Sequence, residues 1–218
     1  MIHDFGIVWG ERSLLLSGLA NTALLSVLAG VASLLLGFLL TPVLMSRKPA
    51  IARTARGFVD AMRCIPFLLF AYIVYYGLPS VGINFDNWSA GLAALTVYNA
   101  AYMAEILRGA WAAMPKEPIE AGTAFGFYGL RRFRRIILPP LVLAAGPVVG
   151  NQVIQIIKDS AFLTIIAVPE LTHAASSIQS RHYVPFAAFI VAVLLYWGLC
   201  LVVEAGVGLV GRRAEARR

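Results

Sequence analysis

The most informative segment of this chain is residues 115–139, PKEPIEAGTAFGFYGLRRFRRIILP, a polar segment between long apolar runs. Its pattern predicts a short helix, a break at Gly126 and then a basic amphipathic stretch. Glu120 falls in an early turn of the short helix, where a carboxylate complements the helix dipole. Phe125, Phe127 and Phe133 offer apolar surface that a partner's pocket could accept. On the residues alone, an amphipathic helix lying on anionic lipid fits equally well.

The composition on both sides of this segment is that of a membrane protein. Hydrophobic residues make up 60% of the 218 residues and charged residues 13%, and the mean hydropathy is +0.79. Soluble domains have about a quarter of their residues charged. One membrane domain covering residues 1–218 is therefore expected, with an all-α fold, because a bilayer admits only helices and closed barrels.

Five apolar runs are long enough to cross a bilayer, which takes about 20 residues per helix. The expected helices cover residues 14–40, 58–78, 88 or 89 to 111, 139 or 140 to 158, and 184–210. The first is closed by Thr41 and Pro42. Residues 159–183 are too polar and too broken by Pro169 to predict a sixth crossing.

Positive charge predicts the topology, because short cytoplasmic loops are rich in Lys and Arg. The basic side chains cluster between the first and second helices, between the third and fourth, and after the fifth: Arg47, Lys48, Arg53, Arg56; Lys116, Arg131, Arg132, Arg134, Arg135; Arg212, Arg213, Arg217, Arg218. An odd number of crossings puts all three groups on one side. We expect the N-terminus outside and the C-terminus in the cytoplasm, and the net charge of +7 then needs no nucleic acid as a partner.

The loop of residues 112–138 resembles the EAA loop of ABC importer permeases, in which a coupling helix docks into a groove on the ATPase. The resemblance implies an ATPase-coupling role for Glu120, Ala121, Gly122, Phe125, Gly126, Ile136, Leu138 and Pro139. Gly122 stands where the family usually has Ala.

Further segments resemble the polar amino-acid branch of this family, in order along the chain. They are Arg63-x-x-Pro66, Tyr75 to Pro79, Ala101 to Gly109, Gly150-Asn151, Lys158 to Ser160 and Val168 to Leu171. Residues 67–70 lack the Gln that is common there, and Ser160-Ala161-Phe162 replaces Thr-Ser-Leu, so the substrate stays open.

The resemblance implies a type I ABC importer permease in a bacterial inner membrane. Its partners would be an ABC ATPase dimer, an external solute-binding protein, membrane lipid and a second permease subunit, either a copy or a relative. No Walker A motif occurs in the chain, so ATP hydrolysis is expected from a separate chain that holds ATP-Mg. We expect no cofactor and no metal bound by this chain, because His3, His173 and His182 share no ligand spacing.

A polar face is predicted on the fourth helix, where Asn151, Gln155 and Asp159 recur every four residues and Gln152 widens the face. Two interpretations stay open: a substrate path, which the resemblance favours, or hydrogen bonds that only hold helices together. Gln152 is neutral where some carriers of cationic amino acids have an acid, which favours a zwitterionic or amide-type substrate.

Three ion pairs are also expected: Lys158 with Asp159, Arg63 with Glu105, and Glu105 with Arg108 within one helix. Two other classes of function were weighed. An intramembrane hydrolase needs a nucleophile beside a base, and no GxSxG or HExxH motif is present. A stand-alone secondary transporter or channel would not need a docking loop.

Overall fold

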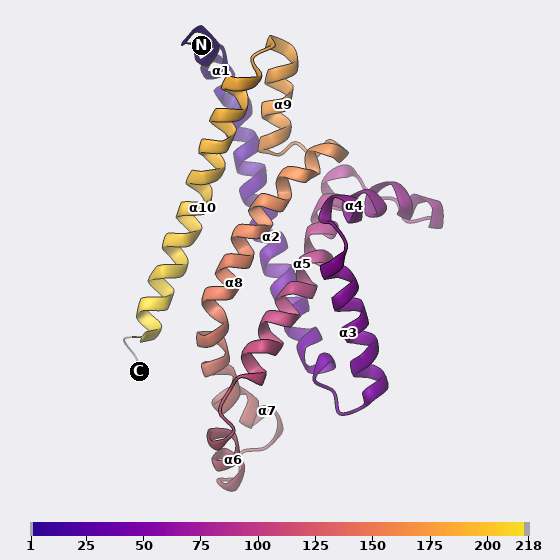
Figure 1. Ribbon diagram of the computed structural model, residues 1–218, viewed down its shortest axis with the longest axis vertical. Helices are drawn as coiled ribbons and strands as arrows, with labels where there is room; N and C mark the ends of the chain where they lie inside the picture. The colour runs from indigo at the N-terminus through magenta and orange to yellow at the C-terminus, as the bar shows by residue number, and fades with distance from the viewer. Residues whose placement is uncertain (1, 216–218) are drawn as a thin grey trace.

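The computed structural model describes residues 2–215, which form an elongated bundle of helices (Figure 1). One end of the bundle carries helix α6 (Glu117–Ala124) and the short α7 (Gly129–Arg132). The opposite end carries α1 (Ile2–Gly10) and α9 (Leu171–His182). These two ends are called the α6 end and the α9 end below.

The centre of the bundle is the pair formed by α2 (Arg12–Leu44) and α5 (Asn87–Ala112). Their backbones touch at Gly37, where an added Cβ would lie 2.6 Å from Cβ of Met103. Only glycine permits this approach. The predicted end of the first helix at Leu40 is wrong, since α2 continues through Pro42 to Leu44. Proline removes only one backbone hydrogen bond of the helix, and the buried Leu44 keeps the last turn packed.

The second predicted helix is not one straight rod. The chain forms α3 (Pro49–Cys64), breaks at Ile65 and Pro66, and continues as α4 (Phe67–Tyr72) with a π-helical turn (Ile73–Gly77) and a 3₁₀ turn (Leu78–Val81). The two halves are bent by 106°. Pro66 causes the break, since it disfavours helical geometry in the residue before it, and Ile65 is extended at φ −84° and ψ 135°.

The second half of the chain supplies α8 (Leu138–Ser160) and α10 (Pro185–Glu215), which lie beside the central pair. A π-helical turn (Phe133–Ile137) leads into α8, and a 3₁₀ turn (Ala161–Ile166) leaves it. Helix α9 follows and has 12 residues, too few to cross a bilayer. Helix α1 was not predicted from the sequence.

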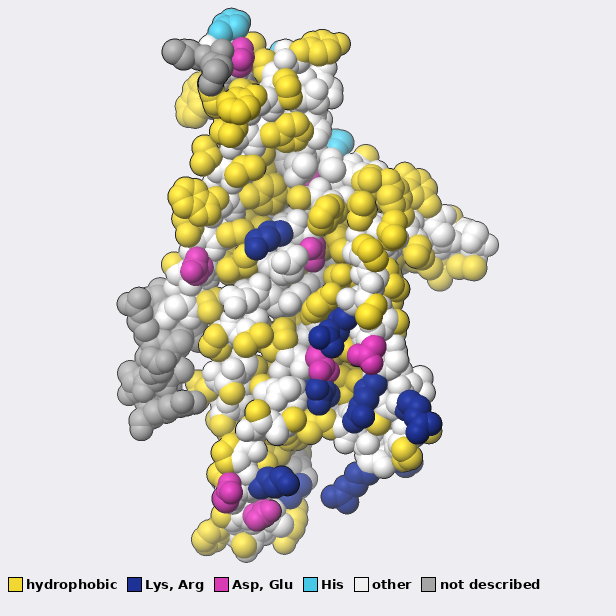
Figure 2. Space-filling model, viewed as in Figure 1, with side chains coloured by type: hydrophobic (Ala, Val, Ile, Leu, Met, Phe, Trp, Pro, Cys, Tyr) yellow, Lys and Arg dark blue, Asp and Glu magenta, His cyan; other side chains and the backbone are white. Residues whose placement is uncertain are grey.

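The all-helical prediction is confirmed. Within residues 2–215, four helical segments are long and apolar enough to cross a membrane, and a fifth crossing results if the bent pair α3–α4 counts as one span. On the face drawn in Figure 2, Lys and Arg side chains gather in the half nearer the α6 end, over α3 and around α6 and α7. Their placement agrees with the grouping of positive charge seen in the sequence.

Candidate functional site

The predicted docking helix is α6, and a glycine closes it. The N–H of Phe127 donates to the carbonyl of Gly122 at 2.9 Å, and the N–H of Gly126 donates to the carbonyl of Thr123 at 3.1 Å. This pair of bonds is a Schellman motif, which requires a left-handed residue after the helix. Gly126 has φ +79°. The glycine break predicted from the sequence is therefore the left-handed residue that directly follows the C-cap residue Phe125.

The inner side of α6 is fixed to the segment that returns to the bundle. Gly122 is buried, and a Cβ added there would overlap Cδ1 of Ile136. Thr123 accepts a hydrogen bond of 3.0 Å from the guanidinium of Arg132. The Gly at the position where the family usually has Ala thus makes room for Ile136.

Phe133 does not belong to the docking surface. Its ring centroid lies 5.7 Å from that of Phe38 on α2 and 5.4 Å from that of Trp111 on α5. The sequence-based placement of Phe133 on a partner-facing surface is wrong, because its ring packs against rings of α2 and α5 at the start of the π-helical turn that leads into α8. Phe133 anchors the loop.

The outer side of the loop is apolar and open. Phe125 is 83% exposed, Leu130 70% and Tyr128 65%. Glu120 and Ala121 are exposed on α6 as well, while Leu138 and Pro139 begin α8. Leu130 and Tyr128 were missed in the sequence, although apolar residues on both sides of Gly129 in a polar loop were a usable signal. We name Phe125, Tyr128 and Leu130 the apolar tip.

The polar face of α8 runs from exposed to buried positions. Asn151 and Gln155 are exposed, whereas Asp159 is 4% exposed and accepts a hydrogen bond of 2.8 Å from Gln155. Gln152 donates to Oδ1 of Asn99 on α5 at 2.7 Å. Asn99 is fully buried and was not predicted as a site residue. A buried amide in an apolar helix needs a hydrogen-bond partner, and this requirement could have indicated from the sequence that Asn99 bonds another helix.

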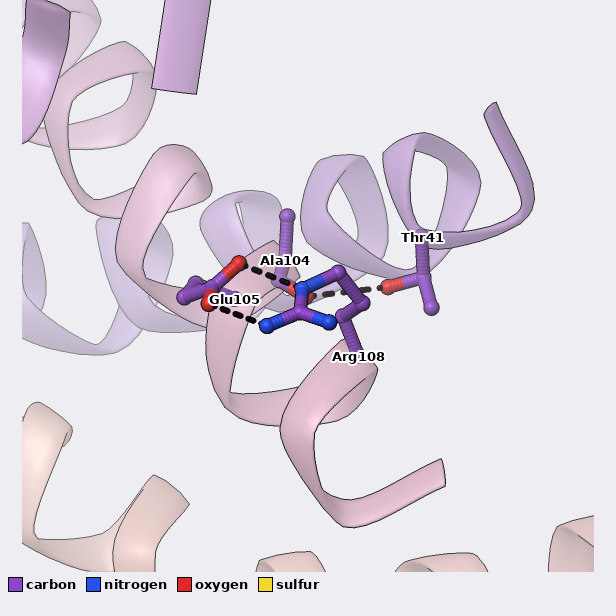
Figure 3. Close-up of polar contacts among 4 residues, drawn as sticks. All are labelled: Thr41, Ala104, Glu105 and Arg108. Carbon is purple, nitrogen blue, oxygen red and sulfur yellow. Dashed lines mark hydrogen bonds and ion pairs between the residues drawn. The ribbon is translucent and has the colours of Figure 1, made fainter. Parts of the chain in front are cut away.

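The expected ion pairs form only in part. Arg108 binds both carboxylate oxygens of Glu105, at 2.8 Å and 2.6 Å, and Thr41 of α2 donates to the neighbouring carbonyl of Ala104 at 3.4 Å (Figure 3). The predicted bridge from Arg63 to Glu105 is wrong, since the Arg63 guanidinium lies over the ring of Tyr102 instead, 6.0 Å from its centroid.

The expected bridge between Lys158 and Asp159 does not form either. Lys158 is exposed and Asp159 is buried, because neighbouring residues on a helix point to different sides. The hydrogen-bond donor to Asp159 is Gln155, one turn away.

A buried carboxylate links α9 to α10 at the α9 end, and the next residue links α9 to α2. Glu170 is the N-cap of α9 and accepts hydrogen bonds from the N–H groups of Thr172 and His173 at 2.7 Å and 2.6 Å, and from the Tyr196 hydroxyl of α10 at 2.6 Å. The N–H of Leu171 donates to Thr22 of α2. Burial raises the pKa of Glu170 above its ordinary value, although its three donors oppose the shift. Glu170 was not predicted from the sequence to have a structural role.

The described residues thus form a multi-helix bundle of membrane-spanning length with an apolar-tipped loop at one end. The chain belongs to the family of binding-protein-dependent transport system inner membrane components, whose family model matches residues 33–216. It is accordingly a multi-pass inner-membrane protein, and its fold is that of type I ABC importer permeases.

Individual relatives agree with this assignment. The chain is 30% identical over 212 residues to the probable glutamine ABC transporter permease protein GlnM of Bacillus subtilis, covering 97% of this chain and 98% of that one. It is 34% identical over 186 residues to the nopaline transport system permease protein NocM of Agrobacterium fabrum, covering 79% and 77%.

The solved structures give the same picture. A crystal structure of an amino acid ABC transporter with histidines matches with a TM-score of 0.88 at 30% identity, over 96% of this chain and 98% of that chain. The MetNI methionine ABC transporter in an inward-facing form matches with a TM-score of 0.78 at 20% identity, over 93% and 97%. At that identity the second likeness concerns the fold alone.

Proposed function

We propose that this chain forms the translocation path of an ATP-driven importer for polar amino acids or related small zwitterions. The relatives of this chain support this substrate class, since they include a probable glutamine permease and a nopaline permease. The family assignment favours an importer subunit and gives no support to a stand-alone secondary transporter or channel.

The observation that carries the proposal is the apolar tip. Phe125 and Leu130 expose large apolar side chains on a loop that the Schellman cap and the Phe133 anchor hold in one shape. Exposed apolar side chains gathered on one loop are typical of protein or membrane interaction sites, and the family assignment favours a protein partner. The partner that fits is a separate ABC ATPase chain, which binds ATP-Mg, so that this chain itself needs no cofactor.

The coupling loop reaches the bundle through the Phe133 ring and through the π-helical turn that leads into α8. Phe133 touches both α2 and α5, and α8 follows directly on the π-helical turn. A displacement of α6 by a closing ATPase dimer would therefore reach the central helices as a rigid-body rotation. In this account residues 112–138 act as a coupling loop.

The proposal also covers the orientation of the chain in the membrane and its other partners. The α6 end faces the cytoplasm and the α9 end faces outward, with the N-terminus outside, the C-terminus inside and five crossings when α3–α4 counts as one. The basic side chains near the α6 end support this orientation. A solute-binding protein would dock at the α9 end, and a second permease subunit, a copy or a relative, would complete the path.

The substrate path follows the polar face of α8. Asn151 and Gln155 are open to the surface, and behind them lie the pairs Gln152–Asn99 and Gln155–Asp159. The amide groups of Gln152 and Asn99, and the carboxylate of Asp159, can exchange these partners for a substrate's ammonium and carboxylate groups. The neutral Gln152 suits a zwitterionic or amide-type substrate better than a cationic one.

Uptake by reconstituted vesicles tests the function. The permease, its ATPase and its binding protein are placed in vesicles, and uptake of radiolabelled glutamine is measured with ATP, or a non-hydrolysable analogue, at the ATPase face. The proposal predicts uptake with ATP only. Uptake that follows an ion gradient without ATP would instead establish a secondary transporter.

A further inference from the structure

One carboxylate is exposed on an apolar helix, at a position that neither the coupling loop nor the predicted polar face includes. Glu204 lies on α10, within the segment Pro185–Gly208 that is long and apolar enough to cross a membrane. It is the only charged residue in the sequence of that segment. Ionisable side chains inside a membrane are costly, and they usually line a water-filled path or bind a partner. Glu204 therefore needs water or a partner that the single chain does not supply.

Glu204 lies about halfway along the bundle. Helices α8 and α10 run antiparallel (Figure 1), and they touch where a Cβ added at Gly150 would overlap the side chain of Val207. Glu204 is about one turn from Val207 toward the α9 end, which brings it to the level of Val153. A Cβ added at Gly30, near the middle of α2, would lie 3.9 Å from a side-chain atom of Val153. At this depth the short side chain of Glu204 cannot reach the lipid headgroups.

A cation lies beside this carboxylate on α8. Lys158 is exposed, and it is close enough to Cys200 of α10 for its charge to act on the thiol. Cys200 and Glu204 are four residues apart and share one face of α10. In the described part of the chain neither Lys158 nor Glu204 forms an ion pair or a side-chain hydrogen bond. The charge of Lys158 also acts on Asp159, which is buried and turned away from this surface.

Exposed amides continue the same surface. Asn151, Gln155 and Lys158 follow one another at spacings of four and three residues, so they share one face of α8, and all three are exposed. We name Asn151, Gln155, Lys158 and Glu204 the α8–α10 patch. It holds one cation, one anion and two amides that can donate and accept hydrogen bonds, so it has no net charge. Figure 2 shows that charged side chains lie among apolar ones midway between the two ends of the bundle.

We propose that the α8–α10 patch binds the two charged groups of an amino acid, with Glu204 accepting hydrogen bonds from the ammonium group and Lys158 donating to the carboxylate. An amino acid carries both charges on one carbon, so it neutralises both side chains without adding a net charge. A simple cation would leave Lys158 unpaired, and a simple anion would leave Glu204 unpaired. This site rests on the proposed function, and it adds a residue of α10 to the substrate path.

Ligand-observed NMR, which detects weak binding, tests the site on the full-length permease with its ATPase in lipid nanodiscs, without the binding protein. The probes are glutamine, glutaramate, which lacks the ammonium group, and 4-aminobutanamide, which lacks the carboxylate. Glu204→Gln lowers the affinity for glutamine about 10-fold, as expected for one lost charge-assisted hydrogen bond, and leaves that for glutaramate unchanged. Lys158→Gln lowers the affinity for glutamine by a similar factor and leaves that for 4-aminobutanamide unchanged.

Asp86→Asn is the matched control, because it removes an exposed carboxylate while asparagine still caps α5. It keeps the parental affinity for all three probes. The exchange variant Lys158→Glu/Glu204→Lys tests whether the two side chains only pair with each other, within one chain or between two permease subunits. Exchanged charges would turn the side chain of glutamine in the wrong direction, so this variant binds glutamine weakly.

Three results would overturn the site: parental glutamine affinity in Glu204→Gln, equal losses of glutamine and glutaramate affinity in that variant, or parental glutamine affinity in the exchange variant. Vesicle uptake by the parent, measured in parallel, separates this failure from that of the proposed function. Any of the three results together with ATP-driven uptake of glutamine contradicts the α8–α10 patch alone. Losses specific to one charged group, without ATP-driven uptake, support the patch and contradict the proposed function.

Discussion

The N–H of Phe127 donates a hydrogen bond of 2.9 Å to the carbonyl oxygen of Gly122, and this bond reverses the chain directly after α6. The reversal depends on Gly126, whose φ of +79° is disfavoured for other residues. It leaves Phe125 exposed at the turn while the buried Gly122 faces Ile136. The shape of the apolar tip is therefore set by backbone geometry.

Replacing Gly126 by Val should uncouple transport without unfolding the bundle. Left-handed geometry costs a side-chain-bearing residue about 1–2 kcal/mol, so the turn changes shape while the helices of the bundle are untouched. The measurement is substrate-stimulated ATP hydrolysis in reconstituted vesicles. Gly198→Val is the control, since Gly198 is an exposed helical glycine of α10 with no neighbour within 4 Å of an added Cβ. Equal hydrolysis by both variants would contradict the role of the cap.

Alanine variants of Phe125 and Phe133 should distinguish binding of the ATPase from anchoring of the loop to the bundle. Phe125→Ala removes exposed surface, so it should weaken binding of the ATPase and leave the thermal midpoint unchanged. Phe133→Ala removes two aromatic pairs, each worth about 0.5–1.5 kcal/mol, and should lower the midpoint. Thermal unfolding and ATPase co-purification are measured side by side. The reverse pattern of effects would show that the two roles are exchanged.

Much of this fold could be predicted from the sequence, because apolar runs and turn residues are local signals. The ends predicted for α5 and α8 lie within about two residues of the ends in the structure. The bend at Pro66 could not be predicted in size, since a proline indicates a break but does not set the angle between the two halves. The bond between Gln152 and Asn99 joins residues 53 positions apart, and only packing brings them together.

Some features of the coupling loop could likewise be predicted from the sequence and others could not. The break at Gly126 is a property of one residue type and was visible in the sequence. The inward direction of Phe133 depends on a π-helical turn and on the positions of Phe38 and Trp111, which are tertiary facts. Glutamate is not among the usual N-cap residues, so the role of Glu170 had no local signal.

Variants of Gln152 should change selectivity. Gln152→Glu places an acid beside Asn99 and should shift uptake toward cationic amino acids, and Gln152→Ala should weaken uptake of the preferred substrate. Competition by unlabelled amino acids in the vesicle assay measures both effects. Gln179→Ala, on α9 and away from the polar face of α8, is the control. An unchanged competition profile in both Gln152 variants would leave hydrogen bonding between helices as the role of this face.

The stability of the α9 end should fall as the pH rises. The pKa of Glu170 is raised in the folded protein, so the protonated form stabilises the fold. That stability is fully present below the unfolded pKa of about 4.3 and is lost as the pH rises through the folded pKa. Thermal unfolding between about pH 4 and pH 8 measures the slope, taken against Glu170→Gln. The slope should shrink in Glu170→Gln, and an identical slope in both proteins would contradict the assignment.

Glu170→Ala complements this experiment. It leaves two N–H groups of α9 without their acceptor, at a cost of about 1–3 kcal/mol for each buried group left unpaired, and it removes one of the two partners of the Tyr196 hydroxyl, which keeps Thr172 at 3.0 Å. The thermal midpoint should therefore fall below those of the parent and of Glu170→Gln. A midpoint equal to the parent's would mean that Glu170 does not hold α9 to α10.

Site-specific photo-crosslinking tests the central claim most directly. A photoreactive phenylalanine analogue is introduced at Phe125, or at the control position Phe186, which is 61% exposed on α10. The membranes are then irradiated with the whole importer assembled. The coupling-loop account predicts a crosslink between position 125 and the ATPase chain, and none from position 186. Absence of the ATPase from the products at position 125, with the importer still transporting, would contradict it.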